Sequence, residues 1–402
     1  MDRPRFTRSF TQQLPIPEEA IEAATRVMRS GRLHRYNVAP GEESEASALE
    51  REFAAWQGSR HCLAVASGGQ AMQIVLRAAG VRPGDRVLTN AFTLAPVPGA
   101  IAGVGAEPVL VEINEDLVID LDDLAAKARA SGARVLLLSL MRGHLPDMDR
   151  LMAVAAGMGL KVIEDCAHTM GASWAGRRSG SFGLAGCFST QTYKHMNSGE
   201  GGLLVTDDAE LIARATILSG SYMLYAGHGA GPGAEAFEDV RLDTPNLSAR
   251  MDNLRAALLR PQLRDIDGAV AAWNERHDRV AAYLAGHNAI RLPRRPRDEA
   301  YVGSSIQFLV PGLSESGARG FLADCSARGV ELKWFGAAEP VGFTSAHRSW
   351  RYVAPQSLPR TDRILSGLFD MRLPLTFTLE DCDLISGHIL DAATALDLGA
   401  AA

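Results

Sequence analysis

The chain contains 402 residues, 47% of them hydrophobic, and it carries a formal net charge of -6 at pH 7. This is enough apolar chain for a large core in two or three lobes, and the slightly acidic balance provides no basic surface for nucleic acid or an anionic membrane. Charge and proline near the N-terminus, and the lack of a long apolar run, predict a cytoplasmic protein without a signal peptide or a membrane span.

Helical patterns alternate with short apolar runs in the first half of the chain. Two helical stretches, at 17–31 and 44–58, each end at glycine. Further helical patterns at 69–80 and 147–159 lie between apolar runs that we expect to be strands, at 61–67, 86–90, 107–113, 134–140, 160–165, 186–190 and 201–206. Strands that are apolar on both faces and joined by helices indicate an α/β fold with a mostly parallel central sheet.

The rest of the chain predicts a second, smaller lobe. Helical patterns between 208 and 265 surround a glycine-rich stretch at 226–237, which is typical of a mobile loop or flap. Two apolar runs and a helical pattern follow, at 304–310, 330–335 and 380–396. We therefore expect N-terminal helices and a large α/β domain at 1–265, followed by a small C-terminal α+β domain at 266–402.

The five cysteines are odd in number and scattered along the chain. Because no two of them form a C-x-x-C pair, they favour neither a disulfide framework nor a zinc site, and we expect reduced thiols and no metal centre. The expected partners are small molecules and a second copy of the chain.

Polar residues follow several of the predicted strands. Ligands of open α/β sheets bind at the carboxyl ends of the strands, so these residues are candidates for a site. Glu164 and Asp165 end one apolar strand and are closely followed by His168, whereas Ser189 lies near the end of another and Lys194 follows on the next loop. The predicted helix at 69–80 would offer free N–H groups and its positive dipole end to an anion. The residues at its start are Ser67, Gly68, Gly69 and Gln70.

Pyridoxal phosphate requires an amine, an acid, a group of donors for its phosphate and a flat side chain over its ring. Lys194 would form a Schiff base with the cofactor aldehyde, and Asp165 would keep the pyridine nitrogen protonated so that the ring can accept electrons. The helix N-terminus and serine hydroxyls would hold the phosphate. The sequence therefore predicts a pyridoxal phosphate site.

Each residue of this set also has a simpler explanation. A loop lysine is usually a solvated surface residue, and an aspartate after a strand is more often a helix N-cap. The tract at 67–70 lacks the pattern of a P-loop and would serve equally well as a turn. Cys166 with His168 suggests a thiol nucleophile, but residues two apart face each other poorly in a helix or strand. The ordered set, rather than any one residue, favours the cofactor.

Longer motifs resemble those of a known family. In chain order they are "SGRL", "SGGQAM", "GDRVLTNAFT", "PDMDRLM", "VIEDCAHTMGA", "GCFSTQTYKHMNSGEGGLLVTDD" and "NLSARMDNLRAALLRPQL". Over most of its length the chain is similar to the DegT/DnrJ/EryC1/StrS family of pyridoxal phosphate enzymes of fold type I, best known as sugar aminotransferases. The resemblance implies an aspartate-aminotransferase-like large domain with a mostly parallel sheet and a smaller C-terminal domain.

The resemblance also assigns roles to the candidate residues. Lys194 would be the Schiff-base lysine and the base that moves the proton between substrate and cofactor. Asp165 would pair with the pyridine nitrogen. His168 would lie against the ring face, and Ser189 would contact the phosphate.

Further positions concern the cofactor and the neighbouring subunit. Gly69 and Gln70 stand where the family usually has Thr-Ala, so the resemblance implies phosphate contacts from backbone N–H groups here. Asn246 matches an asparagine that reaches the phosphate of the neighbouring subunit, which implies a homodimer with shared active sites. Where the family has an aromatic residue that stacks on the cofactor, this chain has Leu94, with Phe92 two positions earlier.

Two other departures lie where the substrate would bind. The family's "H-L-Y-G" tract is replaced by "LMRG" at 140–143. The segment "VELKWFGAAEPVGFTS", which begins at Val330, stands where many relatives carry a tyrosine and a histidine near the sugar. The resemblance therefore bears more directly on the cofactor than on the substrate.

The resemblance implies an aminotransferase that moves an amino group from glutamate or glutamine to a keto group, with a nucleotide-linked keto-sugar as the expected acceptor. The alternatives are a non-sugar carbonyl substrate, another reaction such as a racemase or dehydratase, and a ligand-sensing regulator on the same fold. Lys194 argues against the dehydratase branch, in which histidine replaces this lysine. No helix-turn-helix or basic region supports a regulator that binds DNA.

Overall fold

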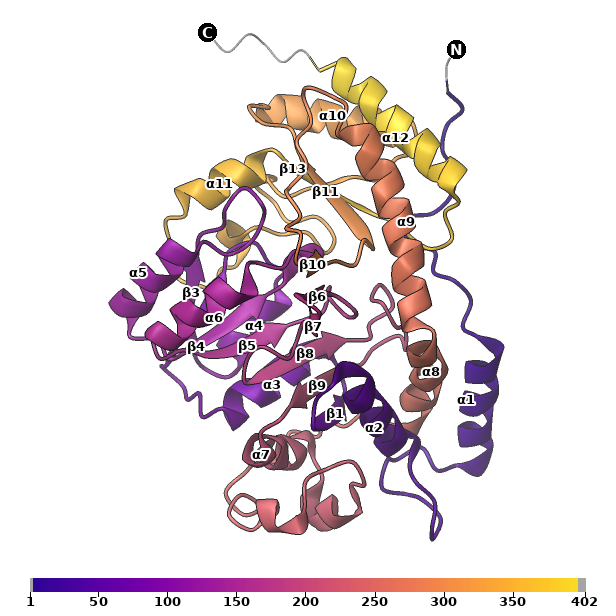
Figure 1. The fold of residues 1–402 in the computed structure, drawn as a ribbon, viewed down its shortest axis with the longest axis vertical. Coiled ribbons are helices and arrows are strands. Elements are labelled where there is room, and N and C mark those ends of the chain that lie inside the picture. Colours follow the sequence, from indigo (N-terminus) through magenta and orange to yellow (C-terminus); the bar gives the residue numbers. More distant parts are fainter. Residues whose placement is uncertain (1–2, 397–402) are drawn as a thin grey trace.

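A sheet of seven strands forms the centre of the larger lobe (Figure 1). The computed structural model describes residues 3–396, so the outermost residues of the two predicted domains, 1–2 and 397–402, lie outside it. The strands follow the order β1-β9-β8-β5-β4-β2-β3, and all of them except β9 run in the same direction. They are β1 (His61–Val65), β2 (Arg86–Asn90), β3 (Glu107–Val111), β4 (Val135–Ser139), β5 (Lys161–Asp165), β8 (Ala185–Ser189) and β9 (Gly202–Thr206).

Helices cover both faces of this sheet because alternate strand residues point to opposite sides. In β4, Leu136 packs into one hydrophobic core and Leu137 into the other. The first core also takes side chains from α2 (Glu45–Gln57), α5 (Leu121–Ser131), α6 (Met148–Gly157) and α8 (Asn253–Arg264). The second takes them from α3 (Gly68–Ala78), α4 (Pro96–Gly103) and α7 (Ala209–Ser219). Helix α1 (Glu18–Ser30) packs against α8.

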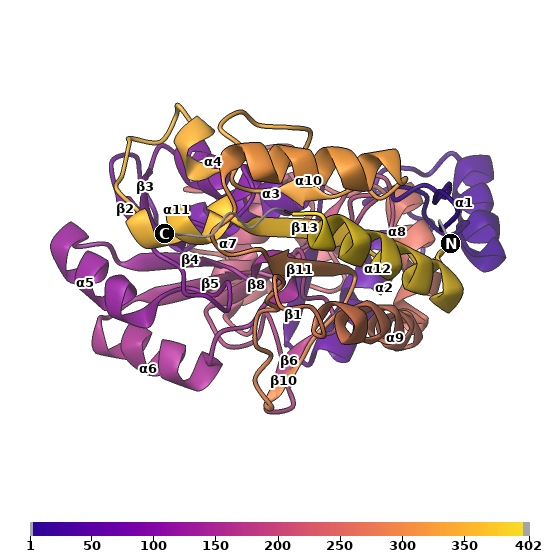
Figure 2. The same ribbon diagram turned by 90° about the horizontal axis from the view of Figure 1, so that it is seen from above.

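The smaller lobe is built on an antiparallel sheet of three strands (Figures 1 and 2). Its strand order is β11 (Ser305–Leu309), β13 (Leu368–Arg372) and β12 (Lys333–Trp334), and its helices are α9 (Ile266–Leu284), α10 (Glu315–Ala327), α11 (Pro359–Ser366) and α12 (Leu379–Thr394). The remaining elements are short: β6 (Ser173–Trp174), β7 (Arg177–Arg178), β10 (Glu299–Ala300), and the 3-10 helices η1 (Met141–Gly143), η2 (Tyr222–Gly227), η3 (Ala234–Phe237) and η4 (His347–Ser349).

The two lobes have separate cores, and the change between them falls within α9. Trp273 packs into a core of the larger lobe, whereas Val280 packs into the core of the smaller lobe. Phe6 and Phe10 return from the N-terminal segment to the smaller lobe, where their rings lie edge-on to Phe377. The division at 265/266 therefore stays a prediction, and we propose α9 as the element that links the two domains.

The predicted α/β class with a mostly parallel sheet is confirmed, and each predicted strand coincides with an observed one. The glycine-rich stretch at 226–237 begins and ends in 3-10 helices, and Phe237 is buried beside Ile217 of α7. Among residues 3–396, no helix combines the length and the apolar character that crossing a bilayer requires.

A buried ionic cluster connects α2, β1 and the segment after α7. Both Glu50 oxygens accept hydrogen bonds from Arg35, at 2.7 and 2.8 Å, and one also accepts the N–H of Ala64 at 2.7 Å. His228 Nε2 lies 3.2 Å from the same carboxylate. Burial alone would raise the pKa of Glu50, but Arg35 and, after it, His228 lower it to about 2. The carboxylate is thus ionised, although solvent does not reach it.

We expect Glu50→Gln to destabilise the protein because Arg35 would keep its buried charge without a counter-charge. Removing one partner of a buried pair lowers the free energy of unfolding by about 3 kcal/mol or more. Urea denaturation measures this loss. Glu43→Gln, which breaks the exposed pair of Glu43 with Arg51, serves as the control and should leave the free energy of unfolding nearly unchanged. Equal losses of unfolding free energy in the two variants would contradict the stabilising role of the buried cluster.

Candidate functional site

A cavity of about 330 Å³ lies at the carboxyl ends of β4, β5 and β8, where the larger lobe faces the smaller one. Its wall includes residues from both lobes, such as Thr93 of the larger and Arg372 of the smaller. Eight of the candidate residues line it: Ser67, Gly68, Gly69, Leu94, Asp165, His168, Ser189 and Lys194. The strand direction explains this meeting, since parallel strands end at the same edge of the sheet.

The N-terminus of α3 forms one end of the cavity. Ser67 caps the helix by accepting the N–H of Gln70 at 3.1 Å, which leaves the N–H groups of Gly68 and Gly69 without an intrahelical partner. A Cβ at Gly68 would lie 2.9 Å from the Ser189 Cβ, so glycine is what allows this close approach. Two open N–H groups, a helix dipole and the neighbouring serine are suited to bind a phosphate.

Asp165 stands at the end of β5, and its carboxylate is held in place. Its two oxygens accept hydrogen bonds from the Ser139 hydroxyl and from the N–H of Ala167, both at 3.2 Å. Ser139 in turn accepts a hydrogen bond from the Thr93 hydroxyl at 2.7 Å. Burial raises the pKa of Asp165, and Lys194 opposes this shift. A carboxylate so enclosed gains from a cationic partner such as a protonated ring nitrogen.

The neighbouring Glu164 points to the opposite face of the sheet, as alternation along a strand requires. It is fully buried and accepts the backbone N–H groups of Gly180, Phe182 and Gly183 at 2.7 to 2.8 Å. Glu164 thus fixes the loop before β8. Of the acidic pair, Asp165 alone lines the cavity.

Lys194 and His168 meet in the cavity wall. The Lys194 Nζ lies 2.8 Å from the His168 Nε2. Burial and the neighbouring Arg142 lower the pKa of Lys194 to about 7, and Asp165 opposes them. Burial, together with Lys194 and Arg142, holds the pKa of His168 well below its usual value. The imidazole is therefore neutral and can accept a hydrogen bond from the lysine.

Three candidate residues do not line the cavity. The Gln70 N–H is used by the helix cap. The Phe92 ring is buried against Phe335, with 5.1 Å between the ring centroids. Asn246 is exposed and accepts the N–H of Ser248 at 2.8 Å within its own loop.

Several lining residues had not been identified from the sequence. They are Thr93, Ser139, Arg142, Tyr193, Phe343 and Arg372, among others. Ser139 ends a predicted strand, and this position could have identified it. Phe343 and Arg372 come from the smaller lobe, more than a hundred residues after Lys194, and no local pattern connects them with the site. All three segments that depart from the family pattern contribute to the wall, through Leu94, Arg142 and Phe343.

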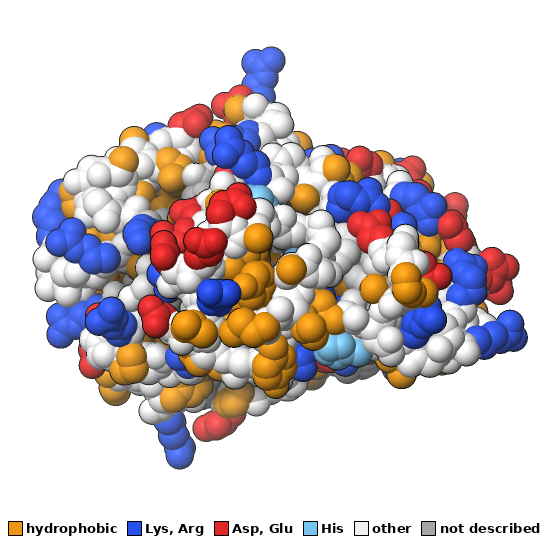
Figure 3. Space-filling model, turned by 90° about the horizontal axis from the view of Figure 1, so that it is seen from below, with side chains coloured by type: hydrophobic (Ala, Val, Ile, Leu, Met, Phe, Trp, Pro, Cys, Tyr) orange, Lys and Arg blue, Asp and Glu red, His pale blue; other side chains and the backbone are white. Residues whose placement is uncertain are grey.

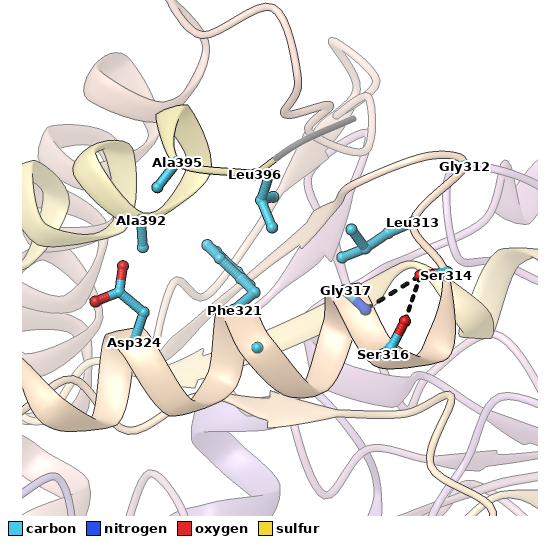
Figure 4. A pocket seen from close by; sticks show the side chains of 11 residues that line it. Gly312, Leu313, Ser314, Ser316, Gly317, Phe321, Asp324, Ala392, Ala395 and Leu396 are labelled. Atoms are coloured by element: carbon cyan, nitrogen blue, oxygen red, sulfur yellow. Dashed lines mark hydrogen bonds between the residues drawn. The ribbon is translucent and has the colours of Figure 1, made fainter. Parts of the chain in front are cut away.

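A second hollow, of about 520 Å³, lies between α10 and the C-terminal end of α12 (Figure 4). Its wall is mostly apolar or glycine, and Ser314 there caps α10 by accepting the N–H of Gly317 at 3.1 Å. Among the described residues that line it, Asp324 is the one charged side chain, and it already pairs with Arg328 at 2.9 Å. Among residues 3–396, this hollow therefore offers no unpaired charged side chain.

The residues of the first cavity fit pyridoxal phosphate. The open N–H groups of Gly68 and Gly69 match its phosphate, the enclosed carboxylate of Asp165 matches its ring nitrogen, and the amine of Lys194 matches its aldehyde. Leu94 and His168 both line the cavity, and an apolar side chain and a flat imidazole are suited to contact a ring.

Comparisons with known proteins agree with this fit. The sequence profile described as the DegT/DnrJ/EryC1/StrS aminotransferase family matches residues 15–389. The chain is 36% identical over 250 residues to L-glutamine:2-deoxy-scyllo-inosose aminotransferase from Streptoalloteichus tenebrarius. The matched residues make up 62% of this chain and 58% of that protein. It is 31% identical to 3-amino-5-hydroxybenzoate synthase from Amycolatopsis mediterranei, with 80% of this chain and 82% of that protein covered.

A solved structure extends the likeness to the fold. The crystal structure of S. venezuelae DesV in complex with a ketimine intermediate matches with a TM-score of 0.79 and 27% identity, and covers 96% of this chain and 100% of DesV. The first relative is matched over less than two thirds of its length, whereas the family profile covers nearly the whole chain. The chain belongs to the DegT/DnrJ/EryC1/StrS aminotransferase family, whose members have the fold type I architecture and depend on pyridoxal phosphate.

Proposed function

We propose that this protein is an aminotransferase that uses pyridoxal phosphate to move an amino group from glutamine or glutamate to a keto group. The observation that supports this most directly is that the Lys194 amine, the Asp165 carboxylate and the open N-terminus of α3 surround one cavity. When bound there, pyridoxal phosphate supplies a ring that accepts the electrons of a breaking C–H bond.

Lys194 is proposed as the nucleophile and the proton carrier. Only an unprotonated amine attacks a carbonyl, and a pKa of about 7 leaves roughly half of the Lys194 side chains in that form at neutral pH. After the amino donor displaces it, the same amine can take a proton from the donor carbon and return it elsewhere. The neutral His168 ring accepts the lysine hydrogen bond at 2.8 Å and so orients the amine.

Asp165 is proposed to hold a proton on the ring nitrogen. Its two hydrogen bonds, from Ser139 and Ala167, fix the carboxylate at the end of β5. A fixed negative charge in a water-poor cavity stabilises the cationic ring much more strongly than it would in water. Leu94 and His168 are proposed to cover the two faces of the ring, and Ser67, Gly68, Gly69 and Ser189 to hold the phosphate.

The substrates are proposed from the relatives and the resemblance. The Streptoalloteichus relative is named for L-glutamine and an inosose, which supports an amino acid donor and a cyclic ketone acceptor. A nucleotide-linked keto-sugar remains our expected acceptor, and a non-sugar carbonyl compound is the second candidate, supported by the relative named for an aminobenzoate product. The presence of Lys194 favours these over a dehydratase or a purely ligand-sensing protein.

We also propose that the active unit is a homodimer, and we keep the cytoplasmic location as a prediction. Exposed apolar side chains are frequent between α7 and α8, at Tyr222, Met223, Leu224, Leu242 and Leu247. This segment lies at the lower end of Figure 1, and Figure 3 shows apolar side chains gathered across the middle of that face. Asn246 belongs to the same exposed segment, as a residue that reaches into a neighbouring subunit must.

A test of the proposed function uses the donor half-reaction. Enzyme loaded with pyridoxal phosphate and given glutamine or glutamate, without an acceptor, should release about one equivalent of the 2-oxo acid per site, because the amino group stays on the enzyme. Mass spectrometry of the released acid measures this. Lys194→Arg keeps a cation but cannot form the bond to the cofactor, and should release none. Lys161→Arg, at an exposed lysine of β5, should behave as the wild type. Release by Lys194→Arg would contradict the proposal.

We expect Asp165→Asn to slow turnover by about a hundredfold, because the substitution keeps the shape and removes the charge that stabilises the protonated ring. Single-turnover kinetics with glutamine measures the effect. Ser139→Ala, which removes one hydrogen bond to the carboxylate but not its charge, should slow turnover much less. A variant Asp165→Asn as fast as the wild type would exclude Asp165 from this role.

We expect the wild type to show twice the mass of the single chain in light scattering. Leu242→Asp places a charge in the proposed interface and should shift the mass towards the monomer, with loss of activity. Val341→Asp, at another highly exposed apolar residue, in the smaller lobe, should leave the mass unchanged. A fully active monomer would contradict the shared active site.

A further inference from the structure

Two cationic side chains pair with a single carboxylate where the smaller lobe meets the cavity, and a third lies nearby. Arg142 Nη2 lies 2.9 Å and Lys333 Nζ 3.2 Å from the same oxygen of Asp370. Arg372 follows Asp370 by two residues on β13, so both side chains lie on one face of the strand. Arg142 and Arg372 line the cavity.

Asp370 is fixed by the sheet that carries it. Gln307 of β11 and Lys333 of β12 are its direct partners across the strands. The Gln307 amide donates to the second Asp370 oxygen at 2.8 Å. Burial alone would raise the pKa of Asp370, but Arg142 and Lys333 lower it below its usual value. Asp370 is thus an ionised and immobile anchor for the Arg142 side chain.

Cationic side chains outnumber carboxylates around Asp370. Within residues 3–396, no other carboxylate lies at ion-pair distance from Arg142, Lys333 or Arg372. Arg372 has no ion pair in this part of the chain, and its guanidinium lies 4.0 Å from the centre of the Tyr193 ring. Only 7% of the Arg142 side chain is exposed, and its buried Nε has no hydrogen-bond partner among these residues. Enclosed cations with unused donors favour a bound anion.

The backbone at Arg142 is strained. Its φ of 55° and ψ of 24° lie in the left-handed region, which residues with a Cβ rarely adopt. Of the non-glycine residues between 3 and 396 with positive φ, Arg142 is the one that lines the cavity. The next residue, Gly143, also has a positive φ, and a Cβ there would lie only 3.0 Å from the Val302 carbonyl oxygen. Such strain persists only where the surrounding structure fixes the residue, and it is common at ligand-binding sites.

The cations lie away from the phosphate cradle. Arg142, Arg372 and Lys194 also line a smaller hollow that extends towards Phe10 and Ser304, whereas the residues of the α3 N-terminus line only the main cavity. The phosphate of the cofactor already has its own donors in Gly68 and Gly69. The cations are therefore available to a substrate that approaches Lys194 from the side of the smaller lobe.

We propose that Arg142 and Arg372 form an anion subsite that binds an acidic group of the keto acceptor, positioned through Arg142 by Asp370. This rests on the proposed aminotransferase function and narrows its substrate class: the acceptor carries a carboxylate or a phosphate and is not a neutral ring ketone. Two guanidinium groups suit either group, since both present paired anionic oxygens. Arg142 belongs to a segment that departs from the family pattern, at 140–143.

Calorimetric titration of the enzyme loaded with pyridoxal phosphate tests the subsite with three probes. They are 3-hydroxybenzoate for a carboxylate, uridine diphosphate for a phosphate, and the neutral 3-hydroxybenzamide. At least one anionic probe should bind the wild type about tenfold more tightly than the amide, and the probe that does so identifies the acidic group. Arg142→Met and Arg372→Met should each remove most of that preference. Arg214→Met, at a surface arginine of α7 paired with Glu210, should leave it unchanged.

Arg372→Met carries the test independently, because it breaks no ion pair within residues 3–396, whereas loss of Arg142 deprives Asp370 of a partner. Binding of neither anionic probe, or a preference that survives in Arg372→Met, would overturn the proposal. Loss of the donor half-reaction in Arg372→Met with unchanged probe affinities would assign the arginines to the donor and also overturn it. A wild type that fails the donor half-reaction but binds an anionic probe through both arginines would refute the proposed function and leave the anion subsite standing.

Discussion

The parallel direction of the strands in the larger sheet is the constraint on which the site depends. Because β4, β5 and β8 run the same way, Ser139, Asp165 and Ser189 all end at one edge. Helix α3 begins at the same edge, since it follows β1, which runs in that direction too. The Lys194 amine, the Asp165 carboxylate and the N-terminus of α3 thus meet at one cavity.

The smaller lobe contributes charged side chains near the site. The sheet edge provides groups that suit the cofactor, whereas the three-stranded sheet carries Asp370, Lys333 and Arg372. The cations help to lower the pKa of Lys194 to about 7, after burial, so the groups proposed to bind the substrate also favour the neutral amine that the chemistry needs. Charged side chains of both lobes therefore help to set the pKa of Lys194.

The sequence predicted much of this arrangement, and physical reasons explain the rest. Apolar runs identified the strands of the larger sheet, and the polar residues after them led to Lys194, Asp165 and the α3 N-terminus. Phe92 faces Phe335 rather than the cavity because of how the two lobes pack, which no local pattern reveals. Arg142 depends on a left-handed backbone and on an ion pair with a residue more than two hundred positions away. Whether Asn246 reaches a second subunit depends on an interface that a single chain does not contain.

The most direct test of the account is a crystal structure of the protein with pyridoxal phosphate bound. We predict continuous density between the cofactor and Lys194 Nζ, the ring nitrogen within hydrogen-bond distance of Asp165, and the phosphate against the N–H groups of Gly68 and Gly69. A cofactor bonded to another lysine, or a phosphate held by Arg142 and Arg372 instead of the α3 N-terminus, would contradict it.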